Sequence, residues 1–275
     1  MVYRGNPEAP LAQRERKLKA AAARRKEVNG VNQLTKSRSG SNILAGPFCP
    51  KTIEAVQEEL MGKVSQRVTL DVDMAKRGRD LENYKEIALR SGASKATIVS
   101  ISEIPVDERV TLKCQVPRCI SYGVSAHCPP HTLKPKELRK MLKDYHKAIF
   151  FTKDLPTRIM EASEQAYKDL IAAYLDIYGI VSTVESQAFY DGYYLAVGFA
   201  AGSCRHTLCA GQNTCAALEG QSCRHYFRSR PSMEAVGINV FQMVAAAGWD
   251  IYPIGTDASL EAIPKGTMAG IVIVY

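Results

Sequence analysis

Several features that would place this chain in a specialised class are missing from its 275 residues. No apolar run approaches the roughly 18 residues that a membrane-spanning helix needs, and the first ten residues lack the apolar core of a secretion signal. The phosphate-binding sequence Gly-x4-Gly-Lys-Ser/Thr, the dinucleotide-binding Gly-x-Gly-x2-Gly turn and the zinc-protease sequence His-Glu-x2-His are also absent. These absences argue against nucleotide hydrolysis, nicotinamide binding and zinc proteolysis, and we expect a cytoplasmic protein without a membrane span.

The composition is that of a globular protein, with 46% hydrophobic and 23% charged residues, which excludes disorder of the whole chain. The charge is unevenly distributed. Residues 1–40 carry ten Lys or Arg and three Glu, and so hold +7 of the chain's net charge of +8. A basic arm of this kind can bind an acidic protein surface or a phosphate backbone, and composition does not separate the two.

Hydrophobic spacing predicts alternating helices and strands after this arm. We expect helices at 81–88, from Pro135, at 158–178 and at 233–247 behind a Ser232 cap, and strands at 96–105, 109–114, 147–152, 193–200 and 271–274. This order predicts an α/β or α+β fold with a mixed sheet flanked by helices and with cysteine-rich loops. We divide the chain into a basic N-terminal arm and linker (1–50), a connecting segment (51–79) and a cysteine-rich domain (80–275).

Eight cysteines are the other departure from an average composition. An even count is compatible with four disulfides, but disulfide frameworks are typical of small secreted scaffolds rather than of a 275-residue chain without an export signal. Thiolates that bind a metal are therefore the preferred interpretation. Thiols without a metal remain an alternative.

Seven of the cysteines fall into two groups, each expected directly after a strand. The first group has the spacing Cys-x4-Cys-x8-Cys, and the second has Cys-x4-Cys-x5-Cys-x7-Cys. Structural zinc sites usually combine two closely spaced pairs around one ion, whereas the larger iron–sulfur clusters are reached by wider loops. The spacing thus favours one or two iron–sulfur clusters of the 4Fe–4S type, with zinc as the alternative. The predicted ligands are Cys114, Cys119, Cys128, Cys204, Cys209, Cys215 and Cys223.

Seven ligands do not divide into two sets of four. The fourth position beside the first group is left to an exchangeable ligand, to a histidine, to the distant Cys49, or to nothing. His127 and His131 flank Cys128, while His206 and His225 lie beside cysteines of the second group. An open iron would permit chemistry on a substrate, whereas two fully ligated clusters would only carry electrons.

Three arginines are direct neighbours of cysteines in the sequence: Arg118, Arg205 and Arg224. A cation beside a thiol lowers the pKa of that thiol and offsets the negative charge of a thiolate-ligated centre. We therefore expect these guanidinium groups to stabilise the ligands.

Four short motifs are similar to those of a known family: Lys113-Cys114 through Cys119, Tyr122-Gly123, Cys128-Pro129-Pro130 and the stretch 230–238 (RPSMEAVGI). With these motifs the chain resembles the predicted metal-binding proteins known as domain of unknown function 2284. The resemblance covers about residues 80–275. It implies an iron–sulfur or other metal centre in anaerobic-type metabolism, near redox or methyl-transfer systems, and no established reaction. It supports the seven cysteines as ligands and gives little support to Cys49.

The leading hypothesis is an iron–sulfur protein that transfers electrons, or serves as an accessory or maturation component, in a larger redox complex that it contacts through residues 1–50. One alternative is an enzyme whose open-iron cluster acts on a small molecule. The other is a zinc-stabilised module that binds nucleic acid through its basic arm.

Overall fold

The computed structural model describes residues 65–69, 73–161, 163–255 and 258–275. The chain divides into two compact units, and the larger one, Pro50–Pro253 with Ser259–Tyr275, holds every helix and strand named below. The predicted basic arm and linker at 1–50 lie outside the described residues, as does Cys49.

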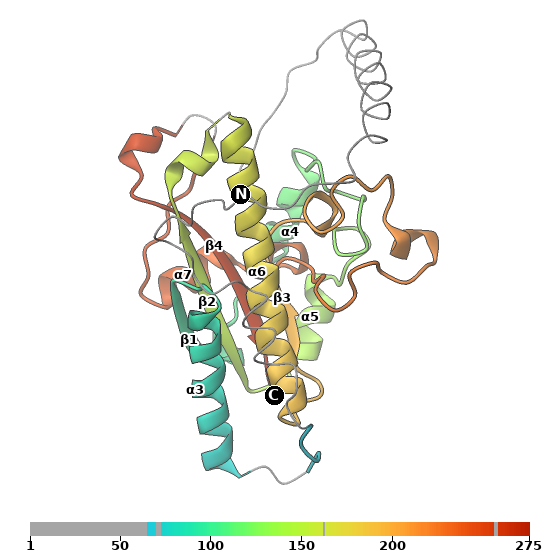
Figure 1. The fold of residues 1–275 in the computed structure, drawn as a ribbon, viewed down its shortest axis with the longest axis vertical. Coiled ribbons are helices and arrows are strands. Elements are labelled where there is room, and N and C mark those ends of the chain that lie inside the picture. Colours follow the sequence, from blue (N-terminus) through green and yellow to red (C-terminus); the bar gives the residue numbers. More distant parts are fainter. Residues whose placement is uncertain (1–64, 70–72, 162, 256–257) are drawn as a thin grey trace, which may run out of the picture. The chain divides into compact units, whose positions relative to one another are not determined.

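Four strands form one sheet in the order β1-β2-β4-β3 (Figure 1). They are β1 (Lys95–Ser100), β2 (Lys147–Leu155), β3 (Val197–Phe199) and β4 (Gly266–Ile273). All three strand pairs are antiparallel, so the fold is α+β, and the sheet is antiparallel where a mixed one was expected.

Helices cover both faces of the sheet. Helices α3 (Met74–Arg90) and α6 (Glu164–Tyr190) lie side by side over one face (Figure 1). Helices α5 (Pro135–Leu142) and α7 (Val240–Ala246) contribute to the core on the other. Short 3-10 helices connect these elements: Ile101–Glu103, Thr157–Met160, Cys204–His206, Ala216–Glu219, Glu234–Val236 and Leu260–Ala262.

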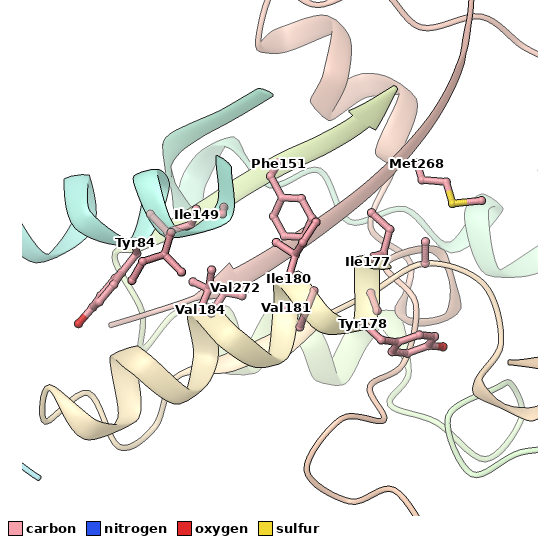
Figure 2. Close-up of a cluster of buried hydrophobic side chains, with 14 of the residues drawn as sticks. Tyr84, Ile149, Phe151, Ile177, Tyr178, Ile180, Val181, Val184, Met268 and Val272 are labelled. Carbon is pink, nitrogen blue, oxygen red and sulfur yellow. The ribbon is translucent and has the colours of Figure 1, made fainter. Parts of the chain in front are cut away.

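The middle strand β2 separates two hydrophobic cores, because alternate side chains of a strand point to opposite faces. Ile149 and Phe151 join the core under α3 and α6, whereas Ala148 and Phe150 join the core on the other face. Figure 2 shows Phe151 beside Ile180 of α6. Burial on both faces explains why the continuous apolar run at 147–152 forms a strand, as predicted.

One predicted strand is a helix. Residues 109–114 alternate between apolar and polar side chains, yet they lie in α4 (Glu108–Gln115). The carboxylate of Asp107 accepts a hydrogen bond from the backbone N–H of Arg109 at 2.8 Å and so caps the helix. No residue of α4 is buried, so the alternating pattern does not serve to pack one apolar face against a core. The local cap by Asp107 therefore decides the conformation.

One predicted helix is broken. The stretch 233–247 divides into the 3-10 helix Glu234–Val236 and α7, with Gly237 between them in a left-handed conformation (φ +93°). The residue that caps the first part is Met233 rather than the expected Ser232, although the hydroxyl of Ser232 accepts from the N–H of Ala235 at 3.1 Å. The break lets Gly237 accept a backbone hydrogen bond from Asp107 at 2.8 Å, which ties this segment to the start of α4.

Other boundaries moved less. The long helix expected at 158–178 begins at Glu164, behind a Ser163 cap, and extends to Tyr190. The strand expected at 193–200 shortens to β3, and the helix expected from Pro135 is α5.

Candidate metal centre

The first cysteine group lies on the end of α4 and the loop that follows it. Cys114 occupies the last turn of the helix, and the N–H of Cys119 donates to the carbonyl oxygen of Cys114 at 3.0 Å. Further along, the N–H of Gly123 donates to the carbonyl of Pro129 at 2.8 Å, which folds the loop back so that Cys128 faces inward and is buried. The group therefore follows a helix rather than the expected strand.

The second cysteine group lies in a long loop that is closed at its base. The loop leaves the sheet after β3 at Ala200, which pairs in parallel with Ser232 on the returning chain. Within the loop, the N–H of Cys209 donates to the carbonyl of Cys204 at 2.9 Å. This is the same backbone contact that joins Cys114 and Cys119, so the two Cys-x4-Cys segments make similar turns.

The two loops meet. The hydroxyl of Ser125, in the first loop, lies 3.2 Å from Sγ of Cys204, and the hydroxyl of Ser203, in the second loop, lies 3.4 Å from Sγ of Cys128. A third contact joins the backbone N–H of Ala126 to the thiol of Cys215. The sequence placed the two groups in separate sites; the fold brings them into contact.

Burial and mutual repulsion disfavour the ionised form of several of these thiols. Burial raises the pKa of Cys114 to about 12, and the neighbouring Cys119 and Cys128 raise it further by charge repulsion. Burial also raises the pKa of Cys128 to about 11, although the Ser203 hydroxyl opposes the shift. A bound cation would relieve both effects, because it replaces lost hydration and separates like charges. The donor set therefore fits a metal centre.

Cys215 differs from the others. Burial raises its pKa, but backbone N–H groups of Ala126, Leu218 and Ala217, together with Arg224, lower it by more, so the pKa of Cys215 lies below its ordinary value. This thiol is the one best prepared to bind as a thiolate.

The arginines beside the cysteines have different roles. Arg205 donates to the backbone carbonyls of Cys209, Gln212 and Asn213 and so shapes the second loop. Arg118 lies over the ring of Tyr122. Arg224 lowers the pKa of Cys215, so the expected stabilisation of a thiol is seen at this arginine.

Two tyrosines of α6 lie close to the cysteines. Burial raises the pKa of Tyr174 to about 12, with Glu234 and Cys119 adding to the shift. Burial, followed by the charges of Cys204 and Cys128, raises the pKa of Tyr178 as well. Figure 2 shows Tyr178 at the end of the row of α6 side chains. Tyr174 and Tyr178 lie in the helix expected at 158–178, and the sequence gave no sign that they would border the cysteines.

The ring of His127 lies close to a cysteine of the second group. Nδ1 of His127 lies 4.0 Å from Sγ of Cys204 and 2.8 Å from the hydroxyl of Ser229. Burial, with a contribution from Arg230, lowers the pKa of His127 and keeps the ring neutral. Of the other candidates, Nε2 of His206 is buried without a hydrogen-bond partner, and His131 is exposed.

The loop base is held by a partly buried ion pair that sequence reasoning missed. Arg230 donates to both carboxylate oxygens of Glu185 on α6, at 2.8 Å and 2.5 Å, and also to the carbonyls of Tyr226 and Ser229. The same carboxylate accepts the N–H of Gly198 in β3 at 2.7 Å. Helix, strand and loop are thereby joined at one point.

None of the seven described cysteines forms a disulfide. Across the described ranges, no three His, Cys, Asp or Glu side chains lie close enough together to hold one metal ion. In those same ranges, no helix has the length and apolar character to cross a membrane.

The contacts between the two loops bring the seven predicted ligands into one region, and their role as ligands stays a prediction.

Comparisons with known proteins give one family. No curated protein and no solved structure matches the chain. A family model described as "Predicted metal-binding protein (DUF2284)" matches residues 97–274, a span that runs from β1 to the end of β4 and contains both cysteine groups. Since this match covers well over half of the chain, the protein belongs to the DUF2284 family of predicted metal-binding proteins.

Proposed function

We propose that this protein holds iron–sulfur clusters, one or two of the 4Fe–4S type, between its two cysteine loops. In this role it transfers electrons, or acts as an accessory or maturation component, in a larger redox complex. The observation that carries the proposal is the convergence of unpaired thiols from two distant loops, at the point where Ser125 meets Cys204 and Ser203 meets Cys128.

The spacing of the cysteines favours a cluster over a single zinc ion. Structural zinc sites usually combine two closely spaced pairs of ligands around one ion. A cluster spans a larger volume, and wide spacings such as Cys-x4-Cys are used for it. Both cysteine groups begin with this spacing.

The chain supplies further groups that would act on bound thiolates. The backbone N–H of Ser121 donates to Sγ of Cys119, and that of His225 donates to Sγ of Cys223, each at 3.4 Å. Donors to sulfur stabilise the more negative, reduced state and so raise the reduction potential. When bound, such a cluster accepts and releases single electrons. The chain's own part is to hold the sulfurs and to limit their contact with water.

A second candidate is an enzyme with an open iron. The count of three thiols in the first loop, against four in the second, favours it, because one cluster would then lack a fourth cysteine. The nearest histidine to the loop contact, His127, already bonds to Ser229. An open iron would bind a small molecule at its fourth coordination position.

The partner is proposed to be a protein of the same redox complex that contacts residues 1–50. The support is the +7 charge of residues 1–40, which favours an acidic surface. Deletion of 1–50 should leave the metal content unchanged and abolish co-purification of the partner. Salt-sensitive binding of DNA or RNA that the deletion removes would favour the nucleic-acid alternative instead.

The decisive experiment is purification without oxygen, followed by iron, sulfide and zinc analysis, absorption spectra and electron paramagnetic resonance. We expect iron and sulfide in the wild-type protein and a loss of at least half in Cys119→Ser and Cys209→Ser. Ser102→Ala, an exposed serine outside both cysteine groups, is the control and should keep the full content. Cys49→Ser tests whether this thiol, outside the residues that match the family, supplies the fourth ligand of the first group. Colourless protein loaded with zinc, or protein without metal, would overturn the proposal.

A further inference from the structure

Two serines reach across the boundary between the cysteine loops. The hydroxyl of Ser125 lies 3.2 Å from Sγ of Cys204, and that of Ser203 lies 3.4 Å from Sγ of Cys128. The partners are 79 and 75 residues apart in the chain, so local structure does not create these contacts. The exchange is reciprocal, because each loop gives one hydroxyl and receives one.

We propose that Ser125 and Ser203 are positioning residues that couple the two cysteine groups, so that each loop places a cysteine of the other. The metal-bound part of this inference rests on the proposed function. The contact itself does not, since it joins side chains of the chain without any bound group.

The direction of the hydrogen bonds follows from what else the hydroxyls bind. The backbone N–H of His127 donates to Oγ of Ser125 at 3.1 Å, and that of Arg205 donates to Oγ of Ser203 at 3.3 Å. Each oxygen accepts from its own loop, and its single hydrogen is available to sulfur; toward a protonated thiol either atom can donate, but toward a thiolate only the hydroxyl can. A thiolate only accepts, so these hydroxyls suit a ligating cysteine.

Water is not a substitute for these contacts. The exposed fractions are 1% for Ser125, 6% for Cys128, 6% for Cys204 and 8% for Ser203. A buried sulfur that loses its hydroxyl partner is left without a replacement, and the loop that carries it shifts. The backbone contact from Ala126 to Cys215 strengthens the same junction.

The consequence is cooperative assembly. If the cysteines of one loop are held by the serines of the other, loss of either loop's geometry weakens both sets of ligands. Metal loading should then be close to all-or-none across the two groups, rather than two independent events.

The first test uses metal-free protein and a double-mutant cycle in urea unfolding. The effect of the double variant Ser203→Ala with Cys128→Ala on the unfolding equilibrium constant should differ by about three- to tenfold from the product of the two single effects. This is the range of one ordinary hydrogen bond. The pair Ser125→Ala and Cys204→Ala should show the same non-additivity. Ser203→Ala with Cys223→Ala is the control and should be additive within about twofold. Additivity in both test pairs overturns the inference.

The second test uses protein loaded with iron and sulfide, and measures alkylation of each cysteine by iodoacetamide with mass spectrometry. Ser203→Ala should lower the protection of Cys128 about three- to tenfold, and that of Cys204 with it, and Ser203→Thr, which keeps the hydroxyl, should restore both. Ser102→Ala, an exposed serine, is the control and should change neither. Loss confined to the cysteine next to the altered serine overturns the inference.

The two failures are distinguishable. Wild-type protein that takes up no iron overturns the proposed function, and the metal-free cycle then still decides the coupling. If the protein binds iron but its double-mutant cycles are additive, the proposed function stands and the coupling between the two loops is contradicted.

Discussion

Replacing Arg230 by Met tests whether the partly buried ion pair holds the second cysteine loop to the sheet. Arg230 and Glu185 have side chains only 19% and 15% exposed, and they form two hydrogen bonds with each other. Removing one partner of a buried pair costs about 3–5 kcal/mol, because the other charge stays buried. The N–H of Gly198 still satisfies one oxygen of Glu185, so we expect the lower end, about 3 kcal/mol.

The assay is urea unfolding of the metal-free protein at neutral pH. Lys168→Met is the matched control: Lys168 pairs with Glu164 at 2.7 Å on the same helix, but the two side chains are 63% and 83% exposed. That pair should be worth less than about 0.5 kcal/mol. A double variant, Glu185→Met with Arg230→Met, removes both charges and should cost less than the single Arg230→Met. A single-variant cost below about 1 kcal/mol, or a double variant that equals the sum of the singles, would refute the reasoning.

Two further predictions concern packing and pH. Gly202 has φ +68°, and an added Cβ would lie 2.5 Å from Cε1 of Tyr174, so Gly202→Ala should cost about 2–4 kcal/mol. Gly211→Ala, at φ +80° with nothing within 4 Å, should cost about 1 kcal/mol, and equal unfolding midpoints for the two would contradict the close contact. Burial, then Asp191, raises the pKa of Tyr84 far above the ordinary value of 10.0, so above pH 10 the unfolded chain loses a proton that the native state keeps. Because the unfolded tyrosine is only half ionised at pH 10, this one group should lower the stability by about 1 kcal/mol between pH 10 and 11, and urea unfolding of Tyr84→Phe should show a fall smaller by that amount over the same range.

The elements that were predicted correctly are those whose signals are local. The apolar run at 147–152 needs two covered faces and becomes β2, and Pro135 begins α5 because its ring suits the first turn of a helix. The failure at 109–114 came from a local cap that outweighed the alternating pattern, and the failure at 233–247 came from a partner far away in the chain. Asp107 caps α4 and also donates its N–H to Gly237, which breaks the second helix.

The amino-acid sequence by itself determined the two cysteine groups, their spacings and, through their motifs, the family. Those features depend on residue types at short separations, and a chain carries them wherever it folds. Only the tertiary structure decided that the groups form one region, since Ser125 and Cys204 are 79 residues apart and meet although the first loop follows α4 and the second follows β3. The roles of Arg205 and Arg230 were likewise settled by the fold, because a guanidinium group binds the carbonyl or carboxylate oxygens that packing places within its reach.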